Sequence, residues 1–261
     1  MTATLDLNAD LGESFGPWRM GQDEALFDIV TSANVACGFH AGDPMEMDRT
    51  VARAKAKGVA VGAHPGFRDL EGFGRRRIQG LAPEEVRTLV RYQVGALAAI
   101  ARAHGLALSH VKLHGALANM ASEDEAIARP FIEAVAAFDP ELAVIAMAAT
   151  ALERTAVAHP HPLVREIYAD RAYADDGTLV ARGTPGAVLH DAEAAAERVL
   201  RMLDEGALTS ITGAKIPARP ETVCVHGDGP QALRMAETLR ARLERAGVRV
   251  QSFAAPAAEP A

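Results

Sequence analysis

This 261-residue sequence is poor in aromatic residues and cysteine and has no excess of positive charge. Aromatic side chains make up 5% of it while hydrophobic residues make up 49%, so a core must be built mainly from Ala, Val, Leu and Ile. Cys37 and Cys224, the only cysteines, lie too far apart to suggest a disulfide framework. The formal charge of -7 argues against a general nucleic-acid binder, which needs a basic surface to neutralise phosphates.

The sequence also lacks long apolar runs. No stretch reaches the length of a membrane-spanning helix, and the first residues have neither the basic nor the apolar region of a secretory signal. We therefore expect no membrane association and a cytoplasmic location. The length fits one α/β barrel, so we expect a single domain over residues 1–253 and a frayed Ala/Pro-rich tail over residues 254–261.

Short apolar runs alternate along the chain with longer, Ala-rich amphipathic runs. The short runs predict seven buried strands, near Leu5, Val35, Val61, Val111, Ile145, Ile167 and Val225. The long runs predict helices over about 44–57 and 83–104, from Ser122 with Glu125 completing a capping box, and after Asp191 and Pro230. Repeated strand–helix units indicate parallel strands with helical crossovers, which both an open doubly wound sheet and a closed barrel satisfy.

Polar side chains gather where the predicted strands end. In parallel α/β architectures the carboxyl ends of all strands meet at one face, where active sites are built. We therefore expect these residues to converge on one pocket, and we interpret the protein as an enzyme. The strand-end residues are Asn8, Asp10, Glu13, Cys37, His40, Asp43, His64, Lys112, His114, Asp170, Arg171, His226 and Asp228.

Four of the nine histidines, His40, His64, His114 and His226, belong to this strand-end set. A single histidine is more often a satisfied structural residue, but four on one predicted face favour a functional role. If a divalent metal is bound, its predicted ligands are Asp10, His40 and His64, because imidazole and carboxylate suit such ions. No HExxH or paired-cysteine motif supports that hypothesis.

Asp10 and Glu13 are candidates for a general acid/base pair, or for holding Mg²⁺ on a nucleotide. The alternative is that the DLGES stretch caps a helix. In the loop EGFGRRRIQG, Arg75, Arg76 and Arg77 form either an anion site or a solvated surface run.

Lys112 would supply a cation for a developing oxyanion or a phosphate if its side chain points into the pocket. Cys37 and Cys224 are expected to be small buried thiols rather than nucleophiles. No GxxxxGK[ST] phosphate loop is present, so any nucleotide site is of another type.

Six strings spread over most of the chain carry a resemblance to a known family. DLNADLGESFG, SANVACGFHAGDP, GAHPGFRDLEGFGRR, HVKLHGALAN, ADRAYADDGTLVAR and VCVHGD resemble, in order, the signatures of the LamB/YcsF family. Two positions depart from the pattern expected there: Leu113 stands in place of Pro and Ala118 in place of Tyr. These changes bear on the shape of that loop and on the fit of the substrate, while Lys112 and His114 are retained.

The resemblance implies an irregular parallel β/α barrel of about seven strands, similar to the glycoside hydrolase/deacetylase barrels. It implies an ATP-dependent 5-oxoprolinase that converts 5-oxoproline, ATP and water to glutamate, ADP and phosphate. It further implies partner subunits B and C, ATP with Mg²⁺ as the nucleotide cofactor, and a small lactam as substrate. Whether the chain also forms a homo-oligomer is left open.

On this hypothesis Asp10 and Glu13 manage the metal–nucleotide or the attacking water, and His40, His64 and His114 act as acid/base groups or ligands. The remaining candidates would bind phosphate or substrate: Asn8, Asp43, Arg75, Arg76, Arg77, Lys112, Arg171, His226 and Asp228. Two other functions stay open, namely a metal-dependent amidase or deacetylase that needs no ATP, and a lactam-binding protein without catalytic activity.

Overall fold

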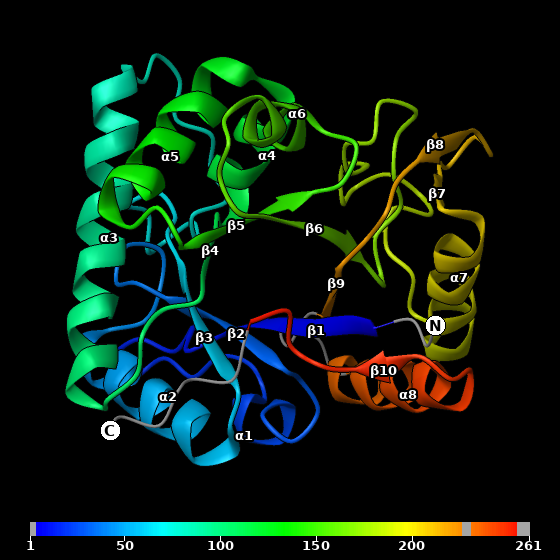
Figure 1. Cartoon of the computed structure of the whole chain (residues 1–261), viewed down its shortest axis with the longest axis horizontal. Helices are drawn as coiled ribbons and strands as arrows, with labels where there is room; N and C mark the ends of the chain where they lie inside the picture. Colours follow the sequence, from blue (N-terminus) through cyan, green and yellow to red (C-terminus); the bar gives the residue numbers. More distant parts are fainter. Residues whose placement is uncertain (1–3, 226–230, 255–261) are drawn as a thin grey trace.

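Seven parallel strands form a closed barrel at the centre of the protein, whose computed structural model describes residues 4–225 and 231–254 (Figure 1). The strands are β1 (Thr4–Leu11), β2 (Ser32–Ala36), β3 (Ala60–His64), β4 (His110–Lys112), β5 (Ala143–Met147), β6 (Leu163–Tyr168) and β9 (Thr222–Val225). The barrel closes because β9 pairs with both β6 and β1, so that Val223 lies opposite Ile167 on one side and Leu7 on the other. All seven predicted strands are present, and closure excludes the open sheet.

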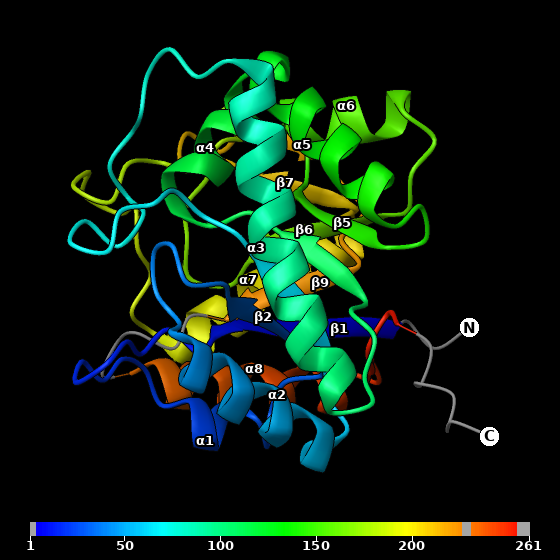
Figure 2. The same cartoon turned by 90° about the vertical axis from the view of Figure 1, so that its left-hand side faces the viewer.

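Helices surround the barrel (Figures 1 and 2). They are α1 (Asp23–Leu26), α2 (Pro44–Lys57), α3 (Pro83–Ala103), α4 (Gly115–Glu123), α5 (Glu125–Phe138), α6 (Ala151–Ala158), α7 (Ala192–Glu205) and α8 (Ala232–Arg245). The predicted bounds of α2 are confirmed: Asp43 caps its first turn, and Gly58 ends it with φ 66°, a left-handed conformation that glycine adopts without strain. In the described residues no helix is long and apolar enough to cross a membrane.

The helix predicted from Ser122 begins elsewhere. Ser122 lies inside α4, and α5 begins only after Asp124, whose carboxylate accepts a hydrogen bond from the Ala126 N–H. The capping-box interpretation was therefore wrong, because Asp124 is itself the capping residue and separates two consecutive helices.

Three short strands were not predicted. β7 (Ala207–Thr209) and β8 (Lys215–Pro217) form an antiparallel pair between α7 and β9, and β10 (Arg249–Val250) pairs with the first residues of β1. Between β6 and α7, residues 169–191 form a long irregular segment that carries Arg171.

The inside of the barrel is polar, although its strands looked apolar in sequence. Hydrogen bonds run up the interior from Asp6 through Thr222 and Asn8 to Asn34 and Asp10. The Asn34 side chain donates to Asn8 Oδ1 at 2.7 Å and to Asp10 Oδ1 at 2.9 Å. Because each buried polar group finds a partner in this column, the interior is held by specific hydrogen bonds as well as by packing.

Candidate active site

A cavity of about 420 Å³ opens at the carboxyl ends of the barrel strands. Six strand-end residues predicted from the sequence line it: Asp10, Glu13, His64, Lys112, His114 and Arg171. Four arginines, Arg75, Arg77, Arg171 and Arg182, line it as well. The predicted convergence is therefore observed for these six residues, which bring acidic, imidazole and cationic groups to one cavity, but not for Asn8, Cys37, His40, Asp43 or Asp170.

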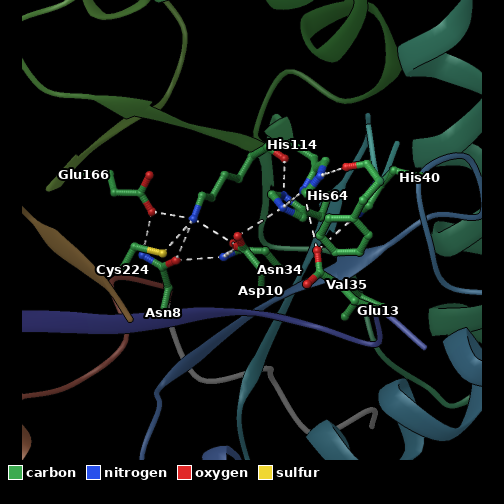
Figure 3. Close-up of polar contacts among 12 residues, drawn as sticks. Asn8, Asp10, Glu13, Asn34, Val35, His40, His64, His114, Glu166 and Cys224 are labelled. Atoms are coloured by element: carbon green, nitrogen blue, oxygen red, sulfur yellow. Dashed lines mark hydrogen bonds and ion pairs between the residues drawn. The ribbon is translucent and has the colours of Figure 1, made fainter. Parts of the chain in front are cut away.

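The Lys112 ammonium lies at the centre of a buried network. It is 2.8 Å from Glu166 Oε1, 3.0 Å from Asp10 Oδ1, 3.2 Å from Asn8 Oδ1 and 3.1 Å from Cys224 Sγ, groups that converge in Figure 3. Burial alone would lower the pKa of Lys112, but the nearby Asp10, Cys224 and Glu166 outweigh it and raise that pKa well above its usual value. Lys112 therefore stays charged and cannot serve as a general base near neutral pH.

Backbone carbonyls fix the orientation of two imidazole rings. His64 Nδ1 lies 2.8 Å from the Lys112 carbonyl oxygen, and His114 Nε2 lies 2.8 Å from the Phe73 carbonyl oxygen. A carbonyl only accepts, so these nitrogens must carry the protons. In the neutral rings, His64 Nε2 and His114 Nδ1 therefore carry lone pairs, and these two atoms face each other at 3.1 Å.

Glu13 and His40 complete the group (Figure 3). Glu13 Oε1 is 3.4 Å from His40 Nε2 and 3.5 Å from His114 Nδ1, while the His40 ring stacks on His114 with centroids 3.6 Å apart. Within the described residues, neither His40 nitrogen has a hydrogen-bond partner, and neither has Glu13 Oε1. Burial raises the pKa of Glu13 and lowers the pKa values of His40 and His114 well below their usual range, which favours uncharged imidazoles.

The helix-capping alternative for Asp10 and Glu13 is wrong. β1 continues to Leu11, and the next helix begins only at Asp23, so neither carboxylate caps a helix. Asp10 instead places Oδ2 3.3 Å from His64 Nε2.

Two of the predicted binding residues have structural partners away from the cavity. Asp43 caps α2 and also accepts a hydrogen bond from the Gly16 N–H at 2.7 Å, and Arg76 pairs with Asp69. Neither lines the cavity, and Asn8 lies in the polar column beneath it. His226 and Asp228 lie outside the described residues.

Several residues of the network were not predicted from the sequence. Asn34 links Asn8 and Asp10 and accepts from His110 Nε2 at 2.8 Å, and Glu166 pairs with Lys112. The signal that identifies them is the alternation of polar and apolar residues along each barrel strand, which places every second side chain inside.

Both positions that depart from the family pattern, Leu113 and Ala118, line the cavity, so they shape the space available to a ligand. Burial raises the pKa of the Cys37 thiol to about 12, which supports the expectation that Cys37 is not a nucleophile.

Comparison with known proteins gives a consistent result. The sequence model of the LamB/YcsF family matches residues 5–258. A Rhodopseudomonas palustris (strain BisA53) protein, named as the A subunit of 5-oxoprolinase, is 54% identical over 251 residues, which cover 96% of this chain and 98% of that protein. The crystal structure of a lactam utilization protein from Thermus thermophilus superposes with a TM-score of 0.90 at 47% identity, covering 96% of this chain and 100% of that one.

A more distant structure supports the predicted kind of barrel. The catalytic domain of a peptidoglycan N-acetylglucosamine deacetylase from Eubacterium rectale ATCC 33656 matches with a TM-score of 0.51 at 10% identity, covering 98% of this chain and 90% of that one. At that identity the likeness extends to the fold alone, a parallel β/α barrel of the deacetylase kind.

Proposed function

The chain belongs to the LamB/YcsF family, and from that premise we propose that it is the A subunit of an ATP-dependent 5-oxoprolinase. With partner subunits B and C it would open the lactam ring of 5-oxoproline to give glutamate, coupled to hydrolysis of ATP bound with Mg²⁺. The relative that carries the name of this subunit supports the assignment, because the identity of 54% extends over nearly the full length of both chains.

The observation that carries the proposal is that one cavity is lined both by arginines and by the acid/base residues Asp10, Glu13, His64 and His114. 5-Oxoproline is a five-membered lactam that carries a carboxylate. Arg75, Arg171 and Arg182 suit that carboxylate and a phosphate group, because guanidinium groups match both, whereas Arg77 already pairs with Glu123. The cavity volume of about 420 Å³ lies within the range of sites for small ligands.

Opening the lactam ring also requires the acid/base residues of the cavity. A lactam resists water because its amide is stabilised by resonance, and phosphorylation of the carbonyl oxygen by ATP makes the carbonyl carbon a better electrophile. Asp10 is positioned to take the proton of the attacking water, since it lines the cavity and lies beside His64. Lys112 holds Asp10 in place from below, so we assign Lys112 a positioning role.

The test is glutamate release from 5-oxoproline by the purified chain, with and without ATP and with and without subunits B and C. We expect glutamate only when ATP and both partners are present. Glutamate formed by the chain alone without ATP would replace the proposal with an ATP-independent amidase. Binding of 5-oxoproline by the complete assembly without turnover would leave only a binding function.

Substitution of Asp10 and of His64 tests the roles of these two residues. Asp10→Ala and His64→Ala should each lower glutamate release by about 100-fold or more in the assembled enzyme, the first through loss of the general base and the second through loss of the imidazole beside Asp10. The matched control is His104→Ala, which removes a histidine that pairs with Asp48 at the end of α3. Near wild-type rates in the first two variants, with circular dichroism unchanged, would contradict the assignment.

A further inference from the structure

We propose that Glu13, His40, His64 and His114 bind one divalent transition-metal ion of the zinc class at the floor of the cavity. The four residues each offer a ligand atom, and these atoms lie within 4.8 Å of one another. The proposal deepens the function assigned to this cavity, but it rests on the geometry of the four side chains and holds for any substrate.

The spacing of the ligand atoms fits a single ion. Zn²⁺ binds nitrogen and oxygen at about 2.0–2.1 Å in tetrahedral geometry, which requires neighbouring ligand atoms to lie about 3.4 Å apart. Three of the six separations lie close to this value: 3.1 Å between His64 Nε2 and His114 Nδ1, 3.4 Å between Glu13 Oε1 and His40 Nε2, and 3.5 Å between Glu13 Oε1 and His114 Nδ1. All four ligand atoms lie within 4.8 Å of one another, so a small adjustment of the side chains would close the set around one ion.

The orientation of the rings gives a second, independent argument. His64 and His114 each donate one N–H to a backbone carbonyl, so their remaining nitrogens present lone pairs to each other. Two lone pairs at 3.1 Å repel unless something positive lies between or beside them. A carbonyl that fixes the tautomer of a histidine from behind is the usual support for a metal ligand.

His40 and Glu13 supply the third argument. His40 is 1% exposed, yet neither of its ring nitrogens finds a hydrogen-bond partner in the described part of the chain, and the same holds for Glu13 Oε1. Buried polar atoms without partners destabilise a protein, and two of these atoms, His40 Nε2 and Glu13 Oε1, lie 3.4 Å apart inside the cluster, which indicates a ligand that satisfies both. A cation bound by these atoms removes the penalty.

The ligand set differs from the one predicted from sequence, which named Asp10 with His40 and His64. Asp10 contacts His64 through Oδ2 at 3.3 Å, and its Oδ1 is held by Lys112 and Asn34. Glu13 Oε1 instead lies beside both His40 and His114, so Glu13 is the carboxylate of the cluster. Three imidazoles and one carboxylate favour Zn²⁺ or a similar ion over Mg²⁺ and Ca²⁺, which prefer all-oxygen sites. Glu13, His64 and His114 line the cavity, so a bound ion would be within reach of a ligand there and would polarise its carbonyl oxygen if it takes that oxygen as a fifth ligand.

Metal binding to the isolated full-length chain tests the proposal. The protein is stripped with a chelator and titrated with Zn²⁺, Co²⁺ and Mg²⁺ by calorimetry, and the bound metal is counted after dialysis. We expect one equivalent of Zn²⁺ or Co²⁺, a visible Co²⁺ absorption typical of nitrogen-rich coordination, a raised melting temperature with Zn²⁺, and no stoichiometric Mg²⁺.

Variants locate the ion. His40→Ala, His40→Gln and Glu13→Gln should each weaken Zn²⁺ binding by about 100-fold or more, because each removes one of four ligands. His104→Ala and His161→Ala remove histidines outside the cluster and should bind like the wild type. If His40→Ala is unstable, His40→Gln and Glu13→Gln carry the test.

Absence of stoichiometric Zn²⁺ and Co²⁺ in the wild type would overturn the proposal, and so would unchanged affinity in the folded cluster variants. The result is separable from that of the activity assay. If the chain binds one Zn²⁺ but the assembled enzyme yields no glutamate, the metal site stands and the assigned substrate is wrong. If a metal-free chain supports ATP-dependent glutamate release, the assigned substrate stands and the metal site is not needed for the reaction.

Discussion

At the scale of single residues, Lys112 compensates the negative charges of two carboxylates inside the barrel. Its ammonium is shared by Asp10 and Glu166, two carboxylates whose side chains are 16% and 2% exposed. Taking such groups out of water is costly unless a partner compensates them, so the loss of this shared cation should be felt by both.

We therefore expect Lys112→Met to lower the free energy of unfolding by about 3–5 kcal/mol, the range for breaking a buried ion pair from one side. Adding Glu166→Gln to this variant removes one of the two orphaned charges and should recover part of the loss. Denaturant titrations of the wild type, the single variants and the double variant measure the coupling. Equal stability of Lys112→Met and the double variant would show that Glu166 does not depend on Lys112.

At the scale of elements, packing inside the barrel depends on the one glycine of β3. A Cβ built on Gly62 would lie 2.2–2.4 Å from three atoms of the His110 ring, which is itself held by Asn34. The strand can therefore approach β4 and accommodate that ring only because position 62 has no side chain.

Gly62→Ala should destabilise the protein by about 1–3 kcal/mol or more, as for overpacking of a buried site. Gly95→Ala is the matched control: Gly95 lies in α3, its added Cβ meets nothing closer than 4.0 Å, and removing a helical glycine should stabilise by up to about 1 kcal/mol. Thermal unfolding of both variants checks this, and a neutral Gly62→Ala would mean that the His110 ring can move aside.

The helices and strands differ in how well the local sequence predicts them. α2 and α7 begin after Asp43 and Asp191 and end at Gly58 and Gly206, which are local signals that tertiary contacts do not override. β10, by contrast, has two residues, and only its pairing with β1 makes it a strand. Such an element has no local periodicity, so sequence alone could not have revealed it.

At the scale of the whole molecule, the convergence of the site could be predicted because parallel strands bring their carboxyl ends to one face. The membership of the cluster Glu13, His40, His64 and His114 could not be predicted in this way. Glu13 follows Gly12, which has φ 69°, and that turn, rather than the strand, directs the Glu13 side chain toward the histidines. The polar column was missed for a different reason: Asn34 lies between apolar neighbours and Glu166 beside the apolar Ile167, but only barrel closure shows that the side of each strand that carries them faces the interior.

The end of the barrel opposite the cavity is covered by the segment after β10. The Gln251 N–H donates to the Leu5 carbonyl, and Phe253 packs on Ala143, Ile145 and Val164 at the starts of β5 and β6. Its ring also lies edge-on to His110, with centroids 5.3 Å apart. Phe253 thus contacts residues of β4, β5 and β6, including His110, whose ring donates to Asn34 of the polar column.

Phe253→Ala should therefore lower the free energy of unfolding by about 1–3 kcal/mol, somewhat less than for a fully enclosed phenylalanine because Phe253 is only partly buried. It should also speed hydrogen exchange at the amides of β4 and β5, since water gains access to the interior there. Phe138→Ala, at the end of α5 with 41% exposure, removes a similar side chain away from the barrel interior and should leave exchange in β4 and β5 unchanged. Exchange in these strands that is unaffected by Phe253→Ala would mean that the column excludes water through its own hydrogen bonds, without help from the covering segment.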